Sequence, residues 1–107
     1  MKRLLLALAS LAGALSPGLG RAEDYVITLR DGRFSPPVLT VPAGKKLEIA
    51  VRNQDATQAE FESVDLDREK IVDPNGEVLI FIGPLDPGSY GYFDDFHRAT
   101  TGTIVAK

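Results

Sequence analysis

Hydrophobic and polar residues alternate along short segments of the chain, and turn-forming residues separate these segments. Residues 46–52 alternate most regularly, with Leu47, Ile49 and Val51 on one side and polar side chains on the other. An alternation of period two predicts a β-strand with one buried and one solvated face. We predict strands over residues 25–30, 34–41, 46–52, 60–65, 78–82, 90–94 and 103–106.

Turn signals lie between these segments, and the pattern contains no helix of more than one or two turns. The turns are predicted at Asp31-Gly32, Pro42–Lys45, Asp73–Gly76 and Asp86–Gly88, with a bend at Ser35-Pro36-Pro37. Residues 66–70 carry mixed charges and predict at most one helical turn in a solvated connection. The continuous apolar run at 78–82 favours a central strand. The aromatic residues are expected mostly in the core; they are Phe61, Phe81, Tyr90, Tyr92 and Phe93. The sequence therefore predicts an all-β protein, a Greek-key β-sandwich of seven to eight strands.

The N-terminus has the pattern of a secretory signal peptide. Lys2 and Arg3 precede an apolar run of 12 residues, Leu4–Leu15, and a small-x-small triplet ends at Ala22. The run is well short of the roughly 20 residues that span a bilayer, so we favour cleavage after Ala22 over an uncleaved anchor helix. The expected organisation is a signal peptide at 1–22 and one soluble domain at 23–107, in a bacterial periplasm or the extracellular space.

Cysteine and histidine usage excludes several classes of function. The chain has no cysteine and one histidine, so it forms no disulfide, cysteine-ligated zinc site, iron–sulfur cluster or cysteine nucleophile. One histidine also excludes a two-histidine metal site within one chain. Removal of residues 1–22 leaves nine basic and fifteen acidic residues, a net charge of −6. Such a charge disfavours nucleic acid and anionic membranes as partners, and favours cations, metal ions among them.

The order of several short motifs resembles the cupredoxin-like domains of secreted bacterial proteins. The motifs are Pro-x-x-Leu-x-Val-Pro-Ala-Gly ending at Gly44, Arg52-Asn53 at the end of an alternating strand, Pro84-Leu85-x-Pro87-Gly88-x-Tyr90-x-Tyr92, and Gly102-Thr103-Ile104-Val105. The resemblance extends over residues 24–107 and implies the cupredoxin-like sandwich.

The resemblance also implies where copper ligands would stand. The positions of the first histidine, the cysteine, the second histidine and the axial methionine correspond to Ala59, Asp94, His97 and Thr100. Only His97 retains a ligand side chain. A blue-copper centre needs two histidines and a cysteine with a weak axial ligand, so this chain builds no type 1 copper site.

Carboxylates surround the remaining histidine and suggest a different metal site. Asp94 and Asp95 precede His97, and Glu60 and Glu62 follow the former first-histidine position. One imidazole with several carboxylates is a hard oxygen and nitrogen set, which suits iron, manganese or zinc and tolerates copper(II). Period two places Asp94 on the same face as the tyrosines and Asp95 on the other. It also turns Glu60 and Glu62 away from a pocket that Ala59 faces, unless a β-bulge near Ala59 re-aims them.

The Glu-aromatic-Glu string and the lost copper ligands are similar to one branch of the family. This branch comprises the cupredoxin-like domain of EfeO-type periplasmic iron-uptake proteins and the stand-alone components of Ftr-type ferrous iron systems. The resemblance implies a periplasmic accessory that binds, oxidises or delivers iron beside an iron permease. The residues implied in metal binding are His97, Asp94, Asp95, Glu60 and Glu62.

Three functions stay open on the sequence alone. The first is a metal-handling accessory of ferrous iron uptake, with iron or copper(II) as the bound ion. The second is a redox enzyme with ferroxidase-type activity at a copper site that lacks cysteine and methionine. The third is a metal-free interaction module for a periplasmic partner. Hydrolytic catalysis has no support, because no serine lies in a nucleophile elbow.

Overall fold

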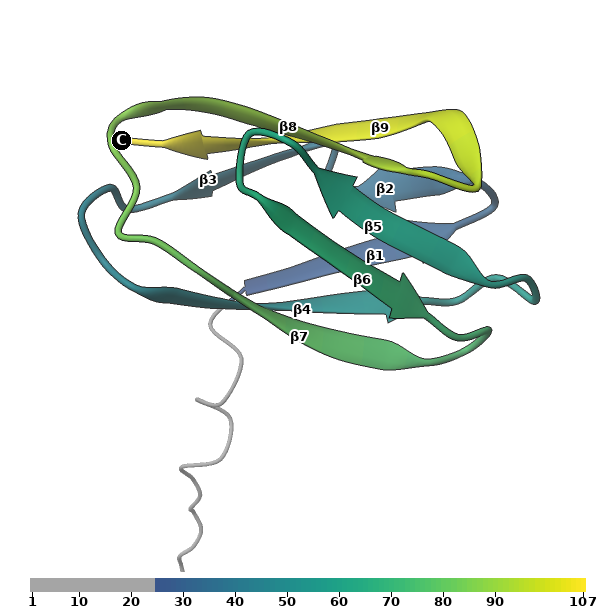
Figure 1. The fold of residues 1–107 in the computed structure, drawn as a ribbon. Coiled ribbons are helices and arrows are strands. Elements are labelled where there is room, and N and C mark those ends of the chain that lie inside the picture. The colour runs from purple at the N-terminus through teal and green to yellow at the C-terminus, as the bar shows by residue number, and fades with distance from the viewer. Residues whose placement is uncertain (1–24) are drawn as a thin grey trace, which may run out of the picture.

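The computed structural model describes residues 25–107, which form nine β-strands (Figure 1). The strands are β1 (Tyr25–Arg30), β2 (Arg33–Ser35), β3 (Val38–Val41), β4 (Leu47–Asn53), β5 (Ala59–Ser63), β6 (Arg68–Val72), β7 (Glu77–Ile82), β8 (Gly88–Asp94) and β9 (His97–Ala106). The predicted signal peptide at 1–22 lies outside the described residues. Within residues 25–107, no helix is long and apolar enough to cross a membrane.

The strands form two sheets that pack face to face, as Figure 1 shows. One sheet has the strand order β2-β1-β4-β7, and the other has the order β3-β9-β8-β5-β6. Two strand pairs, β1 with β4 and β3 with β9, are parallel, and the others are antiparallel. The predicted all-β sandwich is confirmed.

Side chains of alternate residues from both sheets fill the space between the sheets. Ile27, Ile49 and Ile104 are among the fully buried residues. Phe61 and Tyr92 stack with ring centroids 4.8 Å apart, and Phe34 meets Tyr92 edge-on at 4.9 Å. Burying a large apolar side chain stabilises the fold by about 1.5–3 kcal/mol, so this core offsets the absence of disulfides.

The predicted turn at Asp31-Gly32 joins β1 to β2 as a two-residue hairpin loop. Asp31 and Gly32 both have positive φ, 52° and 70°, as expected for the turns whose twist matches the flanking strands. The Asp55 carboxylate accepts hydrogen bonds from both of their backbone N–H groups, at 2.6 and 3.0 Å. The Thr100 hydroxyl donates to the Gly32 carbonyl at 2.8 Å. The turn is thereby attached to β9 and to the loop after β4.

The structure has more strands than the seven or eight expected, for two reasons. The Ser35-Pro36-Pro37 bend divides the segment 34–41 into β2 and β3, which belong to different sheets. Residues 68–72 form the edge strand β6, not a helical turn or an irregular connection. Four of its five side chains are exposed, so it lacks the alternation that identifies a half-buried strand. Pairing with β5 on one side is sufficient to order it.

The apolar run at 78–82 forms an edge strand, so the prediction of a central strand is wrong. β7 pairs only with β4 and closes one side of its sheet. Ile80 and Ile82 face the core, whereas Phe81 is 60% exposed and Leu79 is half-buried. The expectation that Phe81 belongs to the core is therefore also wrong. The run is continuous because its outward side chains are apolar too.

Candidate metal centre

The loop between β8 and β9 places two consecutive aspartates on opposite faces of the five-stranded sheet. β8 ends at Asp94 and β9 begins at His97, and these two residues are register partners. The pairing of β8 with β9 shifts register between Phe93 and Asp94, so the ladder is irregular just before the loop begins. Asp94 is 2% exposed and faces the interior, whereas Asp95 is half-buried on the outer side. The two carboxylates therefore belong to different sites.

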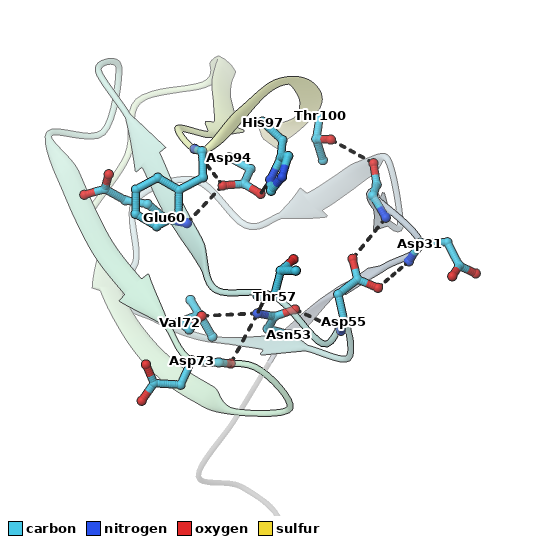
Figure 2. Close-up of polar contacts among 12 residues, drawn as sticks. Asp31, Asn53, Asp55, Thr57, Glu60, Val72, Asp73, Asp94, His97 and Thr100 are labelled. Atoms are coloured by element: carbon cyan, nitrogen blue, oxygen red, sulfur yellow. Dashed lines mark hydrogen bonds and ion pairs between the residues drawn. The ribbon is translucent and has the colours of Figure 1, made fainter.

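The Asp94 carboxylate is saturated with hydrogen bonds (Figure 2). Its Oδ1 accepts from the backbone N–H groups of Glu60 and Phe96, each at 3.0 Å. Its Oδ2 lies 3.1 Å from Nδ1 of His97. Three partners stabilise a carboxylate that would otherwise be costly to bury. Asp94 thus attaches the loop between β8 and β9 to β5.

His97 is oriented by Asp94 and otherwise faces solvent. Its side chain is 58% exposed, and its Nδ1 is engaged by the aspartate. When the neutral ring donates from Nδ1, the lone pair is on Nε2, which is then the nitrogen left to bind a ligand. His97 therefore offers one outward nitrogen at the end of the sandwich.

Asn53 holds the loop that leads into β5. It is buried, and its Nδ2 donates to the carbonyls of Thr57, Val72 and Asp73 at 2.8, 3.2 and 3.2 Å (Figure 2). Its Oδ1 accepts from the backbone of Asp55 at 3.0 Å. These bonds position the start of the strand that carries the two glutamates.

Glu60, Glu62 and Asp95 form a carboxylate cluster on the outer face of the five-stranded sheet. Each offers an oxygen, and these oxygens all lie within 4.8 Å of one another. The alternation of β5 brings Glu60 and Glu62 to one face, because Ala59, Phe61 and Ser63 face inward. Asp95 joins them because its backbone N–H donates to the Glu60 carbonyl at 2.9 Å.

The neighbouring strand adds a fourth carboxylate, Glu69 of β6. It is the register partner of Glu62. A hydrogen bond to Glu69 raises the pKa of Glu60 to about 7, with partial burial and the charges of Glu69, Asp95 and Glu62 acting in the same direction. Crowded carboxylates of this kind hold a proton that a cation displaces.

Arg98 partly neutralises the cluster. Its Nη2 lies 2.6 Å from Oδ1 of Asp95. Its guanidinium lies over the ring of Phe93, 5.4 Å from the centroid, in a cation–π contact. The arginine is 74% exposed, so solvent screens this ion pair. A metal ion bound at Asp95 would compete with Arg98.

The five residues singled out from the sequence thus separate into two groups. Glu60, Glu62 and Asp95 come together outside the sheet, while Asp94 and His97 pair at its inner end. β5 pairs with β6 in register without interruption, so no bulge near Ala59 re-aims the glutamates. Sequence reasoning missed Glu69 because the partner strand β6 was not expected. It missed Arg98 because the last strand was expected to begin only at residue 103, whereas β9 begins at His97.

The sandwich and its altered loop between β8 and β9 define the class of the protein: a cupredoxin-type scaffold without a cysteine. A family model for the cupredoxin-like domain matches residues 3–106, so the chain belongs to this family. A relative from Rickettsia prowazekii (strain Madrid E), named Uncharacterized protein RP394, is 46% identical over 97 residues, which are 86% of this chain and 78% of the relative.

Solved structures of an amicyanin, a purple cupredoxin and an auracyanin share the fold. The amicyanin from Paracoccus versutus matches with a TM-score of 0.64 at 15% identity, over 80% of this chain and 83% of the other. A purple cupredoxin from Nitrosopumilus maritimus matches with a TM-score of 0.64 at 18% identity, over 78% of this chain and 100% of the other. Reduced auracyanin from Roseiflexus castenholzii matches with a TM-score of 0.64 at 15% identity, over 78% of this chain and 95% of the other. Identities this low show the common fold alone.

The residues of this chain do not fit a type 1 copper ion. The chain has no thiolate. Ala59 offers no donor atom, and the Thr100 hydroxyl is hydrogen-bonded to the Gly32 carbonyl. Asp94, in the position that the resemblance gives to the cysteine, is already bonded to three groups. The inner site is therefore closed by hydrogen bonds within the chain, and the hard oxygen donors lie outside the sheet.

Proposed function

We propose that the protein is an exported metal-handling accessory that binds a hard divalent or trivalent cation, iron above all, as cargo. The observation that carries this proposal is the cluster of Glu60, Glu62 and Asp95, whose oxygens all lie within 4.8 Å. Carboxylate oxygens at such separations suit Fe(II), Fe(III) and Mn(II). The signal-like N-terminus and the net charge of −6 after its removal support a periplasmic role in collecting cations.

The cluster has features that suit binding and release rather than permanent retention. It lies on the outer face of the five-stranded sheet, where its half-buried carboxylates are accessible to solvent and to a partner. Binding has to displace the proton shared by Glu60 and Glu69, and it competes with Arg98 for Asp95. Both competitors lower the affinity and give an acceptor a route to remove the ion. The proposed acceptor is an iron permease or another component of a ferrous iron uptake system.

The second candidate function is a metal-free interaction module. The three hydrogen-bond partners of the Asp94 carboxylate favour it, because they give this side chain a structural role in holding the loop between β8 and β9 against β5. On this alternative, the fold and its loop between β8 and β9 are retained to display a surface. The alternatives differ in whether the outer carboxylates bind metal ions at all.

Anaerobic isothermal titration with Fe(II), Mn(II), Zn(II) and Cu(II) tests the proposal. We expect binding of one ion, weakened by a factor of ten or more in Glu60→Gln, Glu62→Gln and Asp95→Asn. The matched control is Asp86→Asn, which neutralises an exposed carboxylate outside the cluster and should bind as the parent does. Arg98→Gln should strengthen binding several-fold, because it removes the competitor from Asp95. If the parent and all variants bind no ion, the interaction module replaces the metal-handling function.

The same titration locates the site. Loss of binding in His97→Ala, with full binding in the three cluster variants, would move the ion to the Asp94–His97 pair. Ferroxidase-type activity is then measured as oxygen consumption with Fe(II), with and without prior addition of Cu(II). Oxidation above the rate of buffer alone would favour the redox enzyme over the accessory.

A further inference from the structure

The edge strands of the two sheets, β6 and β7, lie side by side (Figure 1). A pocket of about 440 Å³ lies where β7 ends, beside the start of β6. Small-molecule sites usually enclose about 300–1,000 Å³. The lining of this pocket includes Lys46, Glu48, Arg68, Phe81 and Gly83. None of the four carboxylates of the outer cluster lines it, so the pocket is separate from the proposed metal centre.

Gly83 keeps part of this pocket free of side chains. It directly follows β7 and has a φ of 93°, in the left-handed region that favours glycine. A Cβ at this position would collide with the carbonyl oxygen of Lys45. The close approach of the two chain segments therefore requires glycine at position 83. No side chain from this position can fill the space next to Phe81.

Arg68 reaches this pocket from β6 and is held in place by backbone carbonyls. Its Nε donates to the Phe81 carbonyl at 2.9 Å, and its Nη1 donates to the Asp67 carbonyl at 2.8 Å. Among residues 25–107 no carboxylate pairs with Arg68, and its Nη2 makes no hydrogen bond. The guanidinium thus keeps its full charge and has donors left for an anion. Because the side chain is already ordered, binding costs it less conformational entropy.

Lys46 and Phe81 add a second cation and an apolar ring. Lys46 is exposed and makes no ion pair within the described part of the chain. Phe81 is 60% exposed. With the cations Lys46 and Arg68 and the carboxylate of Glu48, the lining has a net charge of +1. This sign is opposite to the −6 of the whole domain after removal of residues 1–22, so the pocket is a local site for an anion.

We propose that this pocket binds a small organic anion that contains an aromatic ring, an aryl carboxylate in chemical class. The ring packs on the exposed ring of Phe81, and the carboxylate accepts hydrogen bonds from Nη2 of Arg68 and Nζ of Lys46. Glu48 is the register partner of Phe81 and lies beside it. Its carboxylate disfavours a second acidic group on the ligand and accepts a hydrogen bond from a ring hydroxyl.

An NMR titration of the ¹⁵N-labelled exported protein with benzoate, at constant ionic strength, tests this proposal. We expect saturable shifts confined to the backbone amides around the pocket, with a Kd on the order of 1 mM. 4-Hydroxybenzoate should bind at least as tightly. Acetate lacks the ring and terephthalate carries a second carboxylate, so each should bind at least about fivefold more weakly. Absence of saturable shifts up to about 50 mM benzoate overturns the proposal, as does equal binding of acetate.

Two variants locate the binding site. Phe81→Ala and Lys46→Gln should each weaken benzoate binding at least about fivefold. The matched controls are Phe96→Ala, at a 45% exposed ring in the loop between β8 and β9, and Arg33→Gln, at an exposed cation on β2. Both controls should bind as the parent does. Arg68→Gln should also weaken binding, and thermal unfolding verifies that the variant is folded. Equal affinity of the parent, Phe81→Ala and Lys46→Gln would place benzoate elsewhere and overturn the proposal.

Discussion

The Asp94 carboxylate accepts a hydrogen bond from the backbone of Glu60 at 3.0 Å, while the Glu60 side chain points to the other side of the sheet. One residue of β5 thus belongs to both sites, through its backbone on the inner side and its carboxyl on the outer side. Any change that releases Asp94 should therefore move the strand that displays the outer cluster. The hydrogen bonds that Asp94 accepts and the outer carboxylate cluster are thus coupled through the peptide unit of Glu60.

The first prediction concerns the hydrogen bonds that the Asp94 carboxylate accepts. Asp94→Ala leaves the part-buried N–H groups of Glu60 and Phe96 without their acceptor, and it releases His97. Leaving such groups unsatisfied costs about 1–3 kcal/mol each, so we expect a loss of about 2–4 kcal/mol in unfolding free energy. Urea denaturation of the metal-free protein measures it. Asp95→Ala, the next residue along the chain, is the control and should cost much less. Equal losses for both would contradict the structural role of Asp94.

The second prediction concerns pH. The pKa of Glu60 is raised to about 7 in the folded protein, whereas an isolated glutamate has a value of 4.5. Between these values the unfolded chain has released a proton that the folded protein retains, so this group makes stability fall as pH rises from about 4.5 to about 7. Below pH 4.5 its contribution is fully present, and above pH 7 it is lost.

Thermal unfolding of the metal-free protein from pH 4 to pH 8 measures this slope. Glu60→Gln should flatten it, because the amide does not titrate. Its matched control, Asp86→Asn, should retain the slope of the parent. Because cations compete with the proton on Glu60, affinity for Fe(II) or Mn(II) should rise over the same interval. A slope that is equal in Glu60→Gln and in the parent would contradict the assignment.

Period two in the sequence was sufficient to predict how the side chains of β5 and β8 are distributed. It placed Ala59 and Phe61 inward and Asp94 on the face of Tyr92, as the structure has them. It placed Glu60 and Glu62 outward on the condition that no bulge near Ala59 re-aims them, and the uninterrupted pairing of β5 with β6 meets that condition. These predictions succeed because an antiparallel strand with one buried face leaves no other register.

The pattern along one strand carries no information about which strand lies beside it. The contact of Glu60 with Glu69 depends on β6, an edge strand whose charged residues show no alternation. The hydrogen bond from Glu60 to Asp94 joins residues 34 positions apart. The exposure of Phe81 was not predicted, because an apolar run has the same pattern in an edge strand as in a central strand.

The third prediction concerns Tyr92. Burial raises the pKa of its phenol, and its hydroxyl has no hydrogen-bond partner among the described residues. Tyr92→Phe removes an unsatisfied polar atom and keeps the stack on Phe61, so we expect up to about 1 kcal/mol of added stability. Tyr90→Phe is the opposite case, because the Tyr90 hydroxyl donates to the Asp86 carbonyl at 2.7 Å. Guanidinium unfolding should show the two variants moving in opposite directions. Destabilisation by Tyr92→Phe would mean that its hydroxyl has a partner in solution.

The last prediction concerns the inner site and its relation to copper-binding relatives. The family resemblance assigns the positions of the four copper ligands to Ala59, Asp94, His97 and Thr100. The triple variant Ala59→His, Asp94→Cys and Thr100→Met should therefore bind Cu(II) and show an intense visible absorption from thiolate-to-copper charge transfer. Hydrogen-bond donors for the new thiolate are already in place, because the N–H groups of Glu60 and Phe96 point to that position.

The double variant Ala59→His and Thr100→Met is the matched control, since it lacks the thiolate and should show no such band. Some loss of stability is expected in both, because Thr100 no longer donates to the Gly32 carbonyl. Absorption spectra on titration with Cu(II) distinguish the outcomes. A folded triple variant without the band would show that the loop from Asp94 to His97 departs from copper-binding geometry. A band would show instead that the side chains, and not the scaffold, exclude type 1 copper from this protein.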